Sequence, residues 1–309
     1  MIEISVILPT HRPHPVRLNR TLRGLRAQTL PPVRWETLLV DNASEPALAP
    51  APLADDAPAN LRVVRESTLG LSHARRRGLA EACGEFIVLV DDDNVLAPEY
   101  LENVLARFAT HPRVGALGGP SRPEFDRAPE PWTREFLPLL ALRDLGPDAR
   151  IADLRPPGAA RDEYPACAPI GAGMALRRDA ARAWFDHSDP AALPDRRGGA
   201  LTSGGDNDIV LHALRTGWSV GYFPELGLTH LIPAGRLEPT YLARLNFGIQ
   251  FSWMRVLHRH AVNPWPPLTP LGARLRQARA WFTHRAWRGP AHAIRWHGAS
   301  GHFAGRVLP

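Results

Sequence analysis

The chain has 309 residues, of which 44% are hydrophobic and 22% charged, which suits one large globular domain or a domain with an appendage. No apolar run approaches the roughly 18 residues needed to cross a bilayer, and the first residues lack the basic start and cleavage site of a secretory signal. Two cysteines are too few for a disulfide framework, so a cytoplasmic location is expected.

Charge is distributed unevenly along the chain. From Arg236 to Pro309 there are eleven arginines and one acid, Glu238, for a local net charge of +10. The whole chain carries +6, so residues 1–235 carry −4. A basic segment that follows an acidic body predicts an anionic partner, either a membrane surface or a nucleic acid.

Short apolar runs alternate with helical patterns over the first 120 residues. This alternation is typical of a parallel sheet covered by helices on both faces. The expected strands are residues 4–8, 37–40, 61–64 and 86–90. One expected helix carries Leu18, Leu22 and Leu25 at helical spacing, and another spans residues 98–108. Polar residues end three of these strands, at Pro9-Thr10, Asp41-Asn42 and Asp91-Asp92-Asp93. Ligands bind beyond the carboxyl ends of strands in such sheets, so these residues are expected to line one crevice.

The later part of the chain is less regular. Residues 120–165 are rich in proline and are expected to form an insertion beside the crevice. Regular structure is expected again at residues 170–176. Helices are expected from residue 178 and at 208–215, and short strands at 220–223 and 226–229. Basic helices are expected at 237–260 and 271–287.

The adjacent acids Asp91, Asp92 and Asp93 directly follow a buried type of strand. Three such carboxylates repel one another, and a divalent cation would relieve that repulsion through hard oxygen ligands. The alternative is an acidic turn that caps the next helix.

Seven segments in order resemble the family-2 glycosyltransferases of the GT-A fold. The first four look like the nucleotide-binding half of that family: residues 6–10, 40–44, 70–75 and 89–93. The last three resemble its acceptor loop, its base-bearing segment and its third metal-ligand position: residues 170–174, 203–208 and 229–230. The resemblance implies an α/β fold with a Rossmann-like, mostly parallel central sheet flanked by helices and a C-terminal helical extension. The expected domains are a catalytic domain at 1–235, divided into a nucleotide-sugar-binding half at 1–120 and an acceptor-binding half at 121–235, and a basic, tryptophan-rich segment at 236–309.

The resemblance also assigns roles to single residues. It implies that Pro9, Thr10, Asp41, Arg75, Asp91 and Asp92 bind the nucleotide-sugar. It implies that Asp93 and His230 bind Mn²⁺ or Mg²⁺ and that Gly173 and Met174 belong to the acceptor loop. Asp208 and Arg236 are further candidates on the acceptor or diphosphate side, Arg236 as a charge-assisted donor to the diphosphate. The alternatives are purely structural: Asp41 would form a turn, and His230 would be a structural histidine.

Asp206 is the expected general base of an inverting transfer. It follows a glycine-rich turn at a helix start, where a carboxylate is favoured, and for that reason an N-cap role is its alternative. Two positions depart from the family pattern: Gly205 stands where a Glu usually precedes the base, and Arg76 stands where Asn is frequent. These departures leave the acceptor contact in doubt and keep a catalytically impaired relative as an alternative.

The sequence therefore predicts an enzyme that moves a sugar from a nucleotide-diphosphate donor to a glycan or lipid-linked acceptor, in cell-surface polysaccharide or glycolipid synthesis. Peripheral attachment to an anionic membrane surface through residues 236–309 is expected, with packing of that segment on the catalytic body as the alternative. A nucleotidyltransferase is disfavoured because residues 7–13 contain no glycine-rich phosphate loop. A nucleic-acid-binding protein is disfavoured because it leaves the acidic triplet unexplained.

Overall fold

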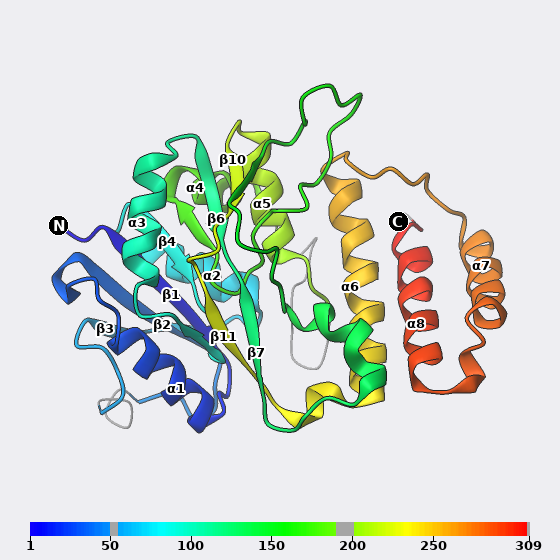
Figure 1. Ribbon diagram of the computed structural model, residues 1–309, viewed down its shortest axis with the longest axis horizontal. Helices are drawn as coiled ribbons and strands as arrows, with labels where there is room; N and C mark the ends of the chain where they lie inside the picture. The colour runs from blue at the N-terminus through cyan, green and yellow to red at the C-terminus, as the bar shows by residue number, and fades with distance from the viewer. Residues whose placement is uncertain (50–54, 190–200, 308–309) are drawn as a thin grey trace. The chain divides into compact units, whose positions relative to one another are not determined.

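The protein, described by a computed structural model over residues 1–49, 55–189 and 201–307, is built on two sheets (Figure 1). The larger sheet has the order β3-β2-β1-β4-β9-β6-β10-β8, and the smaller has the order β5-β11-β7. The strands of the larger sheet are β1 (Ile4–Thr10), β2 (Trp35–Asn42), β3 (Leu61–Glu66), β4 (Phe86–Leu89), β6 (Val114–Gly118), β8 (Arg150–Ala152), β9 (Ala175–Arg177) and β10 (Ser219–Tyr222). The smaller sheet contains β5 (Asn94–Leu96), β7 (Ser121–Phe125) and β11 (Leu228–Ile232).

The four strands β1 to β4 are mutually parallel and carry the apolar runs of the sequence. Every residue of β1 and β2 is buried, as expected for strands covered on both faces. β9 runs antiparallel between β4 and β6, so the sheet as a whole is mixed. The predicted fold class, a mostly parallel α/β sheet flanked by helices, is confirmed.

Helices lie on both faces of this sheet. On one face, Ile4, Val6 and Leu8 share a core cluster with residues of α1 (Pro15–Arg26) and α3 (Tyr100–Thr110). On the other face, Ile7 lines a small internal void together with residues of α2 (Leu71–Glu81), α4 (Arg178–His187) and α5 (Gly205–Arg215). The alternation of side chains along β1 therefore determines which helices each residue contacts.

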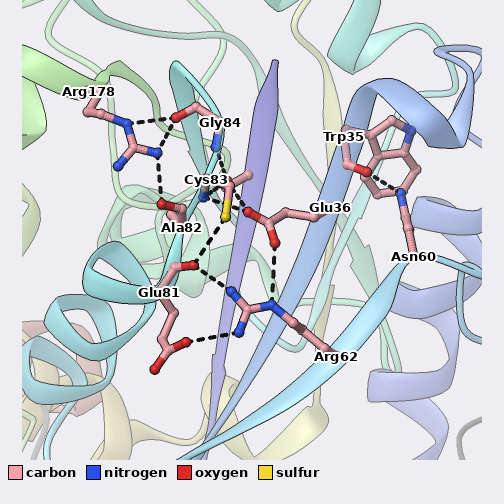
Figure 2. Close-up of polar contacts among 10 residues, drawn as sticks. Trp35, Glu36, Asn60, Arg62, Glu81, Ala82, Cys83, Gly84 and Arg178 are labelled. Atoms are coloured by element: carbon pink, nitrogen blue, oxygen red, sulfur yellow. Dashed lines mark hydrogen bonds and ion pairs between the residues drawn. The ribbon is translucent and has the colours of Figure 1, made fainter. Parts of the chain in front are cut away.

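A polar network closes the amino end of these strands (Figure 2). The buried carboxylate of Glu36 accepts hydrogen bonds from the hydroxyl of Ser5 and the N–H of Cys83, each at 2.7 Å, and contacts Arg62 at 3.4 Å. Arg178 comes from α4 and donates to the carbonyls of Ala82 and Gly84. Every acid and arginine of this network has a partner.

Two structural units divide the chain. The first comprises residues 1–124, 142–188 and 208–231, and the second comprises 125–141, 189–207 and 232–309. In the described part of the second unit, helices α6 (Pro239–Arg259), α7 (Pro270–Thr283) and α8 (Pro290–Gly305) pack side by side, with α8 in the middle (Figure 1). Shorter 3₁₀ segments include η3 (Pro131–Leu140), η4 (Ala234–Leu237) and η5 (Ala286–Arg288).

The helix α8 has no counterpart among the predicted elements. Its sequence contains Gly298, Gly301 and Gly305, which weaken a helix in isolation. A Cβ at Gly301 would lie 2.2 Å from the carbonyl oxygen of Phe247, so the glycines permit α6 and α8 to pack closely. Tertiary packing therefore stabilises a helix that local propensity disfavours.

Other predictions need correction. The strand β6 was not predicted, and the strand expected at 226–229 begins at Leu228 and continues to Ile232. The helix expected at 271–287 ends at Thr283 and is followed by η5. Within the described residues, no helix is both long and apolar enough to cross a bilayer.

Candidate functional site

Asp93 and His230 lie together just beyond the carboxyl end of β4. The sequence places Asp93 directly before β5, and β11 pairs with β5 so that His230 is opposite Asn94. The Nε2 atom of His230 is 3.4 Å from Oδ2 of Asp93, and both residues are 4% exposed. Asn94 donates to Asp93 Oδ1 at 3.1 Å, and the N–H of Leu231 donates to the Asp93 carbonyl. Two positions 137 residues apart are thus joined by strand pairing.

The ends of β1 and β2 meet this region. Thr10 is the register partner of Asp41, and its hydroxyl donates a hydrogen bond to Oδ2 of Asp92. Pro9 precedes Thr10 in β1 and is buried. The sheet therefore brings Thr10, Asp92 and Asp93 to one edge, which is the edge where open α/β sheets bind ligands.

Arg75 approaches the same edge from α2. Its guanidinium is 4.0 Å from Oδ1 of Asp91, and its side chain is 5% exposed whereas that of Asp91 is 37% exposed. The neighbouring Arg76 points elsewhere: it hydrogen-bonds the Phe185 carbonyl and the Ser188 hydroxyl and lies over the Phe185 ring. The departure from the family pattern at position 76 therefore fastens α2 to α4.

The carboxylate of Asp41 is occupied by protein donors. It accepts from the N–H of Ser44 at 3.2 Å and of Leu48 at 3.0 Å, and it pairs with Arg65. Burial by itself raises the pKa of Asp41, but hydrogen bonds from Ser44, Leu48 and Arg65 outweigh it and hold the pKa below its usual value. This geometry is that of a turn-forming acid, and the contact with a nucleobase stays a prediction.

Asn42 and His11 organise the loops around this edge; Asn42 was expected only to line the crevice, and His11 was not predicted to have a role. Asn42 donates to the Thr68 carbonyl at 2.7 Å and accepts from the Gly70 N–H at 2.8 Å, which ties β2 to the start of α2. The Nδ1 atom of His11 is 2.6 Å from the Asn42 carbonyl oxygen. The partners lie 26 to 31 residues apart, so only the strand order could have revealed them.

The segment expected to contact the acceptor is bound to β4. The N–H of Gly173 donates to the Leu89 carbonyl, and the N–H of Leu89 donates to the Met174 carbonyl. Gly173 has φ of +72°, and the hydroxyl of Tyr100 donates to its carbonyl. Met174 is fully buried, so its side chain packs in the core.

The remaining predicted residues lie in or near other elements. Asp206 is the second residue of α5, is half-buried, and accepts a hydrogen bond from the N–H of Asn207 at 3.0 Å. Asp208 is 3% exposed, accepts from the indole N–H of Trp184 at 3.0 Å, and lies 3.7 Å from His212. These contacts link α4 to α5. Arg236 is half-buried in η4.

The Asp93–His230 pair fits a divalent cation. A buried carboxylate oxygen and an imidazole nitrogen that face each other are a donor set suited to Mn²⁺ and, with further oxygen ligands, to Mg²⁺. The adjacent Asp91 and Asp92 add negative charge at the same strand end. The residues present therefore fit the metal that the sequence led us to expect.

Comparison with known proteins identifies the family. The glycosyl transferase family 2 model matches residues 5–185, which is more than half of the chain. A glucosyl-dolichyl phosphate glucuronosyltransferase of Haloferax volcanii is 23% identical over 156 residues, and the match covers 50% of each chain. The succinoglycan biosynthesis protein ExoW of Rhizobium meliloti is 31% identical over 107 residues, which is 33% of each chain. These matches span at most half the length of either curated relative.

The fold has a counterpart among solved structures. The crystal structure of TarS 1–349 from S. aureus superimposes with a TM-score of 0.54 at 15% identity, covering 99% of this chain and 90% of that one. A second crystal structure of TarS 1–349 contains UDP and superimposes equally well at 16% identity. The strand-end residues Thr10, Asp92 and Asp93 lie within the matched residues of the family model, whereas His230 lies outside them. The chain belongs to the family-2 glycosyltransferases and is a transferase with the GT-A fold.

Proposed function

We propose that the protein transfers a sugar from a nucleoside-diphosphate donor to a hydroxyl group of a glycan or lipid-linked acceptor, with inversion at the anomeric carbon and with Mn²⁺ or Mg²⁺ bound. The observation that carries this proposal is the buried Asp93–His230 pair beside Thr10 and Asp92, at the strand edge where this family binds its donor. The named relatives support a glycan or lipid-linked acceptor, because one is named for a dolichyl phosphate substrate and another for succinoglycan biosynthesis.

In the proposed reaction the acceptor oxygen forms a bond to the anomeric carbon while the bond from that carbon to the diphosphate oxygen breaks. The nucleoside diphosphate leaves with the electron pair, and Asp206 takes the proton of the acceptor hydroxyl. A positioned base of this kind contributes about 10² to 10⁴-fold in rate. A divalent cation held by Asp93 and His230 would supply electrostatic stabilisation of the leaving diphosphate.

The other residues are proposed to bind and orient substrates. Asp91 and Asp92 would contact the sugar nucleotide, with Asp92 held by Thr10 and Asp91 facing Arg75. Pro9 and Asp41 would lie along the nucleoside, whereas Gly173, Asp208 and Arg236 would act on the acceptor or diphosphate side; Met174, which was expected to join them, packs in the core and would hold that segment in place. We retain residues 1–235 as the proposed catalytic domain and 236–309 as its C-terminal segment.

We also propose that residues 236–309 place the enzyme on an anionic membrane surface at the cytoplasmic face. Support comes from the local net charge of +10 and from the exposure of Trp265, Trp281 and Trp287. A peripheral enzyme at that surface would meet lipid-linked acceptors directly.

A donor screen with Mn²⁺ tests the transfer. Purified full chain is incubated with nucleotide-sugars, UDP-linked donors first because a solved structure of the same fold binds UDP, and release of nucleoside diphosphate is measured with and without acceptors. NMR coupling constants of the product anomeric proton give the stereochemistry. We expect metal-dependent release that rises with an acceptor and an inverted product. If donors bind tightly but none is turned over with any acceptor class, the chain is the catalytically impaired relative.

A further inference from the structure

Large apolar side chains are exposed on one helix of the C-terminal segment. In α7, Leu271 is 67% exposed, Leu275 is 63% exposed and Phe282 is 68% exposed, and Trp287 of the adjacent η5 is 56% exposed. In an average helix of a folded protein, residues of this kind face the core. These side chains face the solvent.

The exposed side chains form one stripe. With about 3.6 residues per turn, Leu271, Leu275, Ala278 and Phe282 fall on a single narrow face of α7. The opposite face of the helix packs inside its own unit: Ala273 and Ala280 are buried, and Gln277 donates to the Ser300 carbonyl of α8 at 3.1 Å. The stripe therefore points away from the helix that α7 packs against.

Arginines border this stripe on both sides. Arg274 and Arg279 lie on the two flanks of the apolar face, and Arg276, Arg285 and Arg288 are also exposed on α7 and the segment that follows it. The sequence contains no Asp or Glu from Pro239 to Pro309. A narrow apolar face flanked only by cations is the pattern of a helix that lies in the interface of an anionic bilayer.

We propose that α7 is the element that enters the membrane: its Leu271, Leu275, Ala278 and Phe282 stripe inserts below the headgroups of anionic phospholipids, and the flanking arginines contact lipid phosphates. This proposal rests on the membrane contact proposed above and narrows it to one face of one helix. Arginine side chains can extend their charged ends toward phosphates while their aliphatic parts stay with the acyl chains. Trp281 and Trp287 lie 6.3 Å apart beside the stripe, and indole rings settle at headgroup depth. A protein partner would need acids against every flank of the stripe, whereas a sheet of lipid phosphates supplies anions uniformly.

The test uses the full chain and vesicles of phosphatidylcholine with and without phosphatidylglycerol. The variant is Leu275→Ser with Phe282→Ser, and the matched control is Val16→Ser with Val33→Ser, because Val16 and Val33 are equally exposed in the other unit at 63% and 77%. All four side chains are exposed, so the fold is expected to survive, and thermal melting checks this. We expect the wild type to sediment with anionic vesicles and the control to match it. The affinity of the stripe variant for these vesicles should fall at least about tenfold.

Two further measurements separate the contribution of the arginine charges from that of the inserted apolar side chains. Arg274→Gln with Arg279→Gln should weaken binding to anionic vesicles about tenfold or more and reduce its salt dependence, while binding to neutral vesicles changes little. Brominated lipids should quench tryptophan emission of the wild type and not that of the stripe variant. Equal binding to neutral and anionic vesicles, or full binding by the stripe variant, would overturn the proposal. The proposal would also be overturned if the wild type self-associated without lipid and the stripe variant did not, because the stripe would then join two copies of this chain. Vesicle binding needs no donor, so sugar transfer to a water-soluble acceptor can fail or succeed independently of this result.

Discussion

The two ends of the parallel strands β1 to β4 hold acids in different ways. At the amino end, Glu36 is surrounded by donors: a hydroxyl and a backbone N–H bind its oxygens, and the Arg62 guanidinium lies between it and Glu81. At the carboxyl end, Asp91, Asp92 and Asp93 follow one another in the chain and meet Arg75, Thr10 and His230 respectively. Three carboxylates there compete for a limited space, and such a concentration of charge costs folding free energy unless a ligand relieves it.

This difference separates residues that stabilise the fold from residues that we propose to serve the reaction. An acid matched by donors lowers the energy of the folded state, whereas adjacent acids repel one another and are stabilised by a bound cation. Substitution at the two ends should therefore affect different measurements.

Asp93→Ala should abolish sugar transfer and weaken donor binding, because it removes a proposed metal ligand. Treatment of the wild type with excess chelator should have the same result, and added Mn²⁺ should restore the wild type only. Nucleoside-diphosphate release and donor titration calorimetry measure both effects. Full activity in excess chelator would contradict the metal-dependent mechanism.

Asp206→Asn should reduce kcat at least about a hundredfold while donor affinity changes little, because the amide cannot accept the acceptor proton in the transition state. Asp208→Asn is the comparison two residues along α5; because Asp208 is buried against Trp184 and His212, we expect it to lower stability and to reduce kcat less than Asp206→Asn does. If donor affinity of Asp206→Asn falls in parallel with kcat, Asp206 binds substrate or caps α5 and another group is the base.

Glu36→Ala should show the reverse pattern. It leaves the Ser5 hydroxyl without its acceptor and leaves the Cys83 N–H only its longer bond to the Ser5 hydroxyl oxygen, in a buried place, which costs about 1–3 kcal/mol of unfolding free energy. Denaturant unfolding measures the loss, and kcat per folded molecule should stay at the wild-type value. A selective drop in kcat would mean that the amino end of the sheet is coupled to the site.

Asp41 should give the smallest effect, visible only in acid. Its pKa is lowered in the folded state, so its contribution to stability is present above the unfolded pKa and is lost as the pH falls below about 4. Asp41→Asn should therefore flatten the acid limb of the stability curve, while the exposed Asp148→Asn should leave it unchanged. An unchanged acid limb in Asp41→Asn would show that these hydrogen bonds do not favour the charged form.

Sequence patterns predicted the strands that carry the site residues better than they predicted which of these residues contact one another. The runs at 4–8, 37–40, 61–64 and 86–90 predicted β1 to β4, because buried parallel strands have a strong local signature. The pairing of Asp93 with His230 matches the ligand set expected from family resemblance, although periodicity alone could not bring residues 137 positions apart together. Arg65 and Glu36 were missed because their roles depend on strand register: Arg65 is opposite Asp41 only once β3 lies beside β2. The α8 helix was missed because its glycines serve packing and oppose local propensity.

The left-handed conformation of Gly173 has a consequence for altering acceptor specificity. A Cβ at this position would lie 2.6 Å from a Leu228 methyl and 2.8 Å from the Tyr100 hydroxyl. Leu228 is two residues before His230 on β11, so a side chain at position 173 would press on the strand that carries a proposed metal ligand. A library of variants that explores new acceptors should therefore leave Gly173 unchanged and diversify Ile170, which is only half-buried beside it. Substitutions on the proposed acceptor side would then leave the proposed donor site undisturbed.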